Sequence, residues 1–331
     1  MGVAIGTASI FGLAEEAAYG TAVTPARFLE FLPGESLVRR QNFVESQAIG
    51  GSTIRNAQRG AKRIATTQDA GGSISMEVPS RLFGVILKHA LGGTPTIAQQ
   101  GGTAAWLQTH ALGTIADRSL TLQKQLRDAA GTAVKTLTYL GSVITAIEFT
   151  VNPGDGLLRC TIEFDARQEV DTVAAAAASF VASDPFTYAM GTLTVAGAAV
   201  ACARDASIRV ENPFVLDRYC LGTGGLKGRP LDSALPVVSG NFTADFENST
   251  YYDLYKDNTA ASLSLAFVGG IIATGHNAEI GFTLPEIRVS GDSPTIGDTG
   301  VITQPVNFGG WANPANNPAI TATYKSLDTA V

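Results

Sequence analysis

Charged residues are scarce in this 331-residue chain, at 16% of the sequence against the quarter that is usual in globular proteins. Cysteine is also scarce: three residues, with no CxxC pair, argue against a disulfide framework. No apolar run approaches the length of a membrane span, and the first residues lack the basic start of a signal peptide. We therefore expect a protein made and kept in the cytoplasm.

Groupings that would support catalysis or metal binding are missing too. His89, His110 and His276 are far apart and lack the spacing of metal ligands. In the glycine-rich residues 222–228 the lysine is followed by glycine, not serine or threonine, so they do not match a phosphate-binding loop. No GxSxG sequence is present, and no carboxylate pair is marked as an acid–base dyad. The sequence predicts neither an enzyme nor a bound cofactor or metal ion.

Small and apolar residues are abundant instead. The chain has 36 glycines and is 45% hydrophobic, with a net charge of −6. Proteins that grip nucleic acid through its phosphates are normally basic, so this chain should repel DNA on average. Low charge combined with many Gly, Thr and Val residues indicates a β-rich protein whose surface is partly covered in a large oligomer.

One order of polar and apolar positions occurs twice, 168 residues apart (240 − 72 = 168). Each copy has a glycine, Gly72 or Gly240, then an alternating strand, a turn and a short helix that ends near a lysine. Such a repeat predicts two copies of one domain in a single chain. We predict an extended N-terminal arm at residues 1–27, a first domain at 28–171, an alanine-rich linker at 172–183 and a second domain at 184–331.

Alternation of polar and apolar residues predicts a mainly β fold with one short helix in each half. The helices are expected at residues 82–87 and 250–257, and a long loop at 45–71. Strands are expected at 28–32, 35–43, 73–78, 120–126, 136–139, 143–151 and 157–165, and in the second half at 192–195, 206–210, 241–247, 262–267, 279–289 and 320–324.

Carboxylates recur on the polar side of these predicted strands, and few of those sides carry a lysine or arginine. They form either an ordinary solvated sheet face or a wall that faces a negatively charged passenger. A DNA duplex would be repelled by such a wall and would not adhere to it. The candidate residues are Glu77, Asp245, Glu148, Glu163 and Asp165.

Basic residues gather on or beside the long loop. As a nucleic-acid patch the set is weak, because it lacks interleaved aromatic residues and the chain is acidic overall. A contact with an acidic edge of a neighbouring subunit is the better interpretation, and a solvated loop is the alternative. The residues are Arg39, Arg40, Arg55, Arg59, Lys62 and Arg63.

Several motifs, taken in order, resemble the major tail tube proteins of long-tailed, siphovirus-type bacteriophages. In the first half they are residues 16–25, 28–31, 34–37, 72–78 and 87–92; in the second half they are 217–219, 240–247 and 317–324. Each motif is only moderately specific, and their order over essentially the whole chain carries the resemblance.

The resemblance implies two tandem β-sandwich or barrel-like domains, each with one flanking helix. Their sheets would join those of neighbours into a large ring barrel through which DNA passes. Single-domain members form six-membered rings, so three of these chains could complete a pseudo-six-fold ring, with a hexamer as the alternative. The five carboxylates would line the bore, while the arm 1–27 and the basic loop would reach a neighbouring subunit or ring.

The resemblance also implies partners and a location. The partners are further copies of the chain, the tape measure protein, the tail terminator and the baseplate or distal tail proteins, with phage DNA as a transient passenger. The location is the virion tail, assembled in the host cytoplasm.

Two other classes stay open. One is a different virion β-protein, such as a tail terminator, baseplate or decoration component, which would stop at one ring. The other is a secreted adhesin or carbohydrate-binding β-module, which would need a signal peptide and exposed aromatic platforms. Trp106 and Trp311, the two tryptophans, form no visible stripe.

Overall fold

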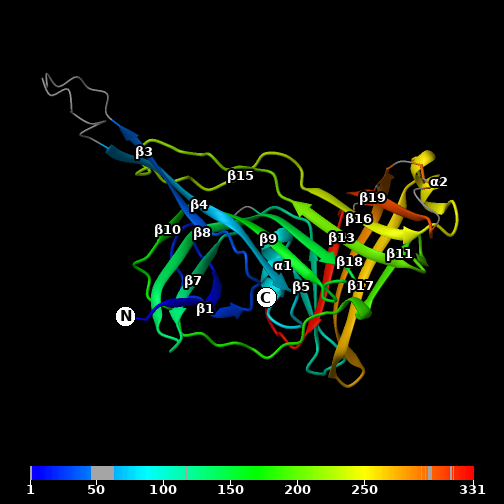
Figure 1. The fold of residues 1–331 in the computed structure, drawn as a ribbon, viewed down its shortest axis with the longest axis horizontal. Coiled ribbons are helices and arrows are strands. Elements are labelled where there is room, and N and C mark those ends of the chain that lie inside the picture. Colours follow the sequence, from blue (N-terminus) through cyan, green and yellow to red (C-terminus); the bar gives the residue numbers. More distant parts are fainter. Residues whose placement is uncertain are drawn as a thin grey trace, which may run out of the picture.

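The computed structural model is mainly β, which confirms the predicted fold class. It describes residues 2–45, 63–115, 118–291, 293–294, 296, 300–313, 315 and 317–331. Three of the predicted loop residues, Arg55, Arg59 and Lys62, lie outside these ranges. Antiparallel strands make up most of the described chain and join in one large sheet (Figure 1).

Eight strands lie side by side in a central sheet that contains strands from both halves of the chain. Every neighbouring pair is antiparallel. In spatial order the strands are β3 (Val38–Glu45), β4 (Arg63–Glu77), β9 (Arg159–Ala166), β8 (Ala133–Val151), β13 (Ala203–Glu211), β16 (Val237–Asp245), β19 (Thr303–Trp311) and β18 (His276–Ser290).

Two long strands continue from the central sheet into an outer layer. β8 pairs with β9 and β13 in its C-terminal part and with β7 (Leu120–Asp128) in its N-terminal part. Gly141, with φ 63°, lies where the partners change, in a conformation that favours glycine. β18 does the same in the second half, where it pairs with β19 near its end and with β17 (Ala261–Ala273) before that.

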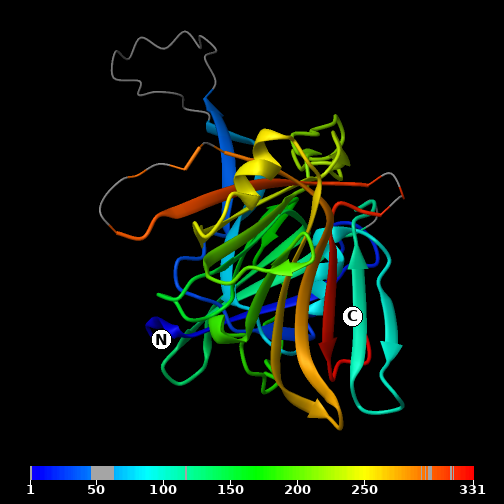
Figure 2. The ribbon, with the colours of Figure 1, turned by 90° about the vertical axis from the view of Figure 1, so that its right-hand side faces the viewer.

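The outer layers of the two halves also correspond. β1 (Ala4–Glu15) pairs with β7, and β11 (Gly191–Val195) pairs with β17. β20 (Thr321–Ser326) lies between β18 and β6 (Trp106–Ala111), as Figure 2 shows. The remaining short strands are β2 (Arg27–Leu29), β5 (Thr96–Gln99), β10 (Gln168–Val170), β12 (Ala198–Ala199), β14 (Phe214–Val215) and β15 (Leu231–Asp232).

The two helices follow the two copies of the repeat but differ in burial. α1 (Gly84–Leu91) buries nearly all its residues and ends at Gly92, whose φ of 80° closes the helix. α2 (Thr250–Lys256) buries none completely, and Tyr251 packs edge-on against Phe242 of β16 at 5.3 Å. A one-turn 3₁₀ helix, η1, spans Tyr188–Met190. Both predicted helices are therefore present, within a few residues of their expected bounds.

One hydrophobic core joins the two halves. Phe149 of β8 lies 4.4 Å from Phe282 of β18 and 6.0 Å from Phe83, measured between ring centroids. All three side chains are buried in the same cluster. The boundaries at 28–171, 172–183 and 184–331 stay predictions, and the two parts share both a core and the β8–β13 strand pair.

Several segments differ from their expected structure. Residues 4–15, within the predicted arm, form β1, because Phe11 and Leu13 bury their side chains in the core. Residues 63–71, within the predicted loop, are part of β4. β6 and β19 are further strands that the sequence pattern does not indicate, and the two strands expected at 136–139 and 143–151 are one, β8.

Candidate functional site: the polar face of the central sheet

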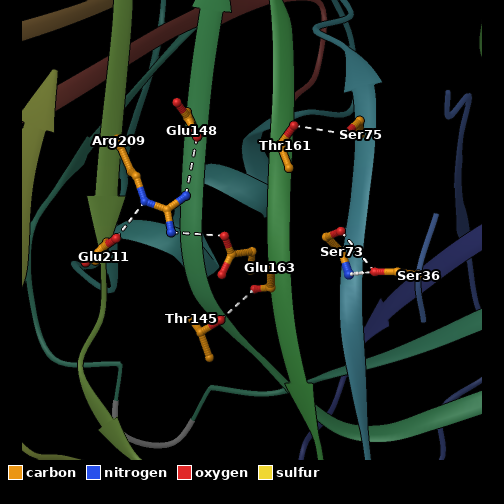
Figure 3. A network of polar contacts seen from close by, with 9 residues as sticks. All are labelled: Ser36, Ser73, Ser75, Thr145, Glu148, Thr161, Glu163, Arg209 and Glu211. Atoms are coloured by element: carbon orange, nitrogen blue, oxygen red, sulfur yellow. Dashed lines mark hydrogen bonds and ion pairs between the residues drawn. The ribbon is translucent and has the colours of Figure 1, made fainter. Parts of the chain in front are cut away.

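One side of the central sheet is apolar and buried, and the other, which we call the polar face, carries hydroxyls and charges. The row Ser75, Thr161, Glu148 and Arg209 crosses four adjacent strands, β4, β9, β8 and β13 (Figure 3). The Ser75 and Thr161 hydroxyls lie 2.9 Å apart. The intervening residues point the other way: Met76, for example, is fully buried. Alternation along the strands thus produces a continuous polar surface.

Arg209 is the centre of the charged part of this face. Its guanidinium contacts Glu211 at 2.6 Å, Glu163 at 2.9 Å and Glu148 at 3.4 Å (Figure 3). Partial burial opposes its charge, but the carboxylates outweigh that effect and raise the pKa of Arg209 above its usual range. Because Glu148 and Glu163 come from the first half and Arg209 from the second, this cluster ties the two halves together across the β8–β13 joint.

The prediction that the carboxylates stand with few cations is wrong. Glu148 and Glu163 both pair with Arg209, as described above. Asp245 also has a cationic partner, Arg204, at 2.8 Å. Hydrogen bonds from Arg204 and Cys202 lower the pKa of the Asp245 carboxyl. Sequence alternation identifies carboxylates on a face, but it does not show which cations neighbouring strands place beside them.

Glu77 and Asp165 lie in different environments on this face. Glu77 ends β4, is partly exposed and is in register with Arg159 of β9. Asp165 is buried beneath Lys227, whose ammonium contacts its carboxylate and lies 3.9 Å from Asp69. Burial raises the pKa of Asp165, although Lys227 opposes this effect. Of the five candidate carboxylates, Asp165 is thus withdrawn from the exposed surface.

Lys227 belongs to a loop, residues 212–236, that connects β13 with β16 and lies across β4. The backbone N–H of Gln68 donates to the Gly225 carbonyl at 2.9 Å. A Cβ at Gly225, whose φ is 80°, would lie 2.0 Å from the Thr66 carbonyl oxygen, so only glycine permits this approach. The loop of the second half is therefore anchored on the first half.

The two copies of the repeat occupy equivalent places with a fixed offset. β16 lies four strands from β4, and the row through Gly240 passes Ile208, Phe149 and Cys160 to Met76. In the sequence repeat, however, Gly240 is equivalent to Gly72, not to Met76. The residue of β4 that lies in the same row as Gly240 is thus four positions beyond its repeat equivalent (76 − 72 = 4), a shift that accumulates over four strands. By the same offset Asp245 lies four residues beyond the row of Glu77, on the same face.

The described basic residues of the predicted loop lie on the β3–β4 hairpin, which extends away from the body of the molecule (Figures 1 and 2). Arg40 lies 3.7 Å from Asp69, and the Arg63 guanidinium lies 4.1 Å from the centre of the Phe43 ring. Arg39 donates to the Gln41 side chain at 2.8 Å. These cations are exposed and are not gathered into one anion site.

Sequence reasoning missed Arg209 and Lys227. Arg209 alternates with Ser207 on the strand predicted at 206–210, so it could have been assigned to the polar side. Lys227 stands in a glycine-rich loop, and no local pattern indicates that it is buried. Over the described residues no group of three or more His, Cys, Asp or Glu side chains could hold a metal ion.

The described residues thus define a mainly β protein whose large antiparallel sheet carries one charge-paired polar face. The chain belongs to the phage tail tube protein family, whose sequence model matches residues 6–310. The family is structural, and membership makes this protein a component of the phage tail. Comparison with curated proteins gives no match. Within the described part of the chain, no helix has the length and apolar character to cross a membrane.

Proposed function

We propose that this chain is the major tail tube protein of a siphovirus-type phage, in which three copies close a ring and stacked rings form the tube that conducts DNA. The observation that carries this proposal is the eight-stranded central sheet, made of two equivalent four-stranded units. Its polar face would line the bore. The tape measure, terminator and baseplate or distal tail proteins would be its partners in a virion assembled in the host cytoplasm.

The two edges of the central sheet support closure of the ring. Among the described strands, β3 pairs only with β4, and its residues are almost all exposed. At the other edge, β18 pairs with β17 only as far as Ile287, which leaves Arg288–Ser290 paired on one side. The four strands of the first unit, in the order β3, β4, β9 and β8, correspond to β13, β16, β19 and β18 of the second unit. The edge strand β3 is therefore equivalent to β13, and the edge strand β18 is equivalent to β8. The β8–β13 joint inside the chain is therefore a template for a β18–β3 joint between chains.

Strand geometry supports a bore of suitable size. Three chains would supply 24 strands, and an offset of four residues per four strands gives a strand tilt of about 35°. A closed barrel of that size has about 45 Å between backbones on opposite sides. The bore is wider than a DNA duplex even after side chains occupy its inner face.

The charge-paired face supports passage without adhesion. Carboxylates outnumber cations around Arg209, so the surface stays acidic on balance, while each charge is held by a near neighbour. Phosphates would meet weak repulsion and no uncompensated cluster of lysine or arginine.

Electron microscopy of the purified protein tests the proposal. We expect hollow striated tubes, and rings released from them should have the mass of three 34.3-kDa chains, about 103 kDa. Single rings that never stack would favour a terminator, baseplate or decoration role. A ring of six chains would reject the trimer and keep the tube.

Charge reversal on the polar face should slow DNA passage. In virions carrying Glu77→Lys with Asp245→Lys, we expect slower DNA ejection, because lysines would attract the phosphates, and the delay should shrink at high salt. The matched control, Asp171→Lys with Asp257→Lys, makes the same charge change at exposed positions away from this face. Equal ejection rates in the two double variants would remove Glu77 and Asp245 from the lining.

A further inference from the structure

We propose that an apolar groove beside Trp311 binds the β3–β4 hairpin of a neighbouring copy of this chain. The inference rests on the proposed ring and specifies which surfaces meet between its subunits. It comes from comparing the two halves, because one of them shows an equivalent site that is already occupied.

The occupied site is on the first half. There the loop 212–236 covers β4 and β9 through the Gly225–Gln68 hydrogen bond and through Lys227, which contacts Asp165 and Asp69. The Tyr219 hydroxyl also reaches the Gln68 carbonyl oxygen, at 3.5 Å. A connection between the first two strands of one unit thus packs on the preceding unit.

The equivalent site on the second half is open. Val237 of the second half is equivalent to Asp69 of the first, because the two are 168 residues apart (237 − 69 = 168). Gly309 is equivalent to Asp165, because the two residues hold the same register positions in the β16–β19 and β4–β9 pairs. Val237 and Gly309 line a groove of about 940 Å³ with Ser239, Trp311 and Pro318. Leu235, Val237 and Trp311 are 85%, 52% and 59% exposed, so the groove presents apolar surface to solvent.

The β3–β4 hairpin matches this groove in position and chemistry. It connects β3 and β4 as the loop 212–236 connects β13 and β16, so ring symmetry would direct it onto the second half of the adjacent chain. Phe43, Val44 and Ile64, at the described end of the hairpin, are each about half exposed. In the first half, two carboxylates at this site bind the lysine of the covering loop. In the second half the equivalent residues are Val237 and Gly309, which carry no charge and therefore suit an apolar occupant.

Cross-linking tests this contact. In a background with the exposed thiols removed (Cys202→Ser and Cys220→Ser), Val44→Cys with Val237→Cys should give covalent trimers when assembled rings are treated with a short bis-maleimide. The control pair, Val44→Cys with Val268→Cys, uses a residue of β17 with similar exposure and should stay monomeric on denaturing gels. Rings that are visible by microscopy but give no cross-link with the Val237 pair would overturn the inference alone, whereas the absence of rings would overturn the proposed function with it.

A second variant measures the energy of the contact. Trp311→Glu should raise the protein concentration needed for tube formation by roughly tenfold or more. Its melting temperature as a monomer should not change, because the side chain is mostly exposed. An unchanged assembly threshold would contradict the docking of the hairpin in this groove.

Discussion

Replacing Phe149 with alanine is expected to lower the free energy of unfolding by about 3–5 kcal/mol, the usual loss for a large aromatic side chain in a core. Phe149 is 2% exposed, and its ring packs between Phe83 of the first half and Phe282 of the second. The cavity would therefore open where the halves meet, and the whole chain should lose stability in one step. Chemical denaturation followed by circular dichroism measures both the loss and the number of transitions.

Phe180→Ala is the matched control for this substitution. The Phe180 ring is 48% exposed, and its centroid lies 6.1 Å from that of Phe28, outside the main core. Its removal should therefore lower the free energy of unfolding by about 1 kcal/mol or less. Two separate transitions, with only the first affected by Phe149→Ala, would show that the halves unfold independently and that the shared core does not couple them.

Lys227→Met should also cost about 3–5 kcal/mol, because it leaves the buried Asp165 carboxylate without its partner. The loop 212–236 would then lose its ionic contact with Asp165 of β9 and keep only its hydrogen bonds to β4, so proteolysis within that loop should become faster. Adding Asp165→Asn should recover much of the loss, because the remaining amide carries no charge. Thermal unfolding of the single and double variants measures the coupling between the two residues.

The pH dependence of the Lys227→Met variant gives a second readout. Burial raises the pKa of Asp165, and removal of the lysine takes away the main effect that opposes this rise. When the pKa of a carboxyl is higher in the folded than in the unfolded protein, the folded protein becomes more stable as the pH falls. The loss of stability caused by Lys227→Met should therefore be smaller at about pH 5 than at about pH 8. Lys256→Met, which removes an exposed lysine from α2, should leave the melting temperature nearly unchanged at either pH, because an ion pair in solvent contributes little to stability. A Lys227 deficit that does not vary with pH would contradict this account.

Strand pattern and repeat order were enough to predict the fold class and most of the central sheet. Residues 73–78 and 241–247 alternate cleanly, and both lie in or overlap strands that end before a helix. β1 was not predicted as a strand, because its twelve residues show no clear polar–apolar alternation and its partner β7 lies more than a hundred residues away in the sequence. Such non-local pairing is decided by tertiary packing, which local propensity does not contain.

The candidate site was predictable in part. Alternation placed Glu77, Glu148, Glu163 and Asp245 on one side of their strands, and the structure brings them to one face. The cations that hold them come from other strands, as Arg209 does, so strand order and register had to be known first. Lys227 depends on the path of a long loop, for which the sequence carries no periodic signal.

The shared strands β8 and β18 have a mechanical consequence. Each is one continuous backbone that belongs to both the central sheet and the outer layer, so the lining of a tube built from these chains would not shear relative to its wall. Curvature of such a tube would have to be taken up at the contacts between successive rings. The tail would then bend as a stack of rigid discs, and the cross-section of its channel would stay constant while it bends.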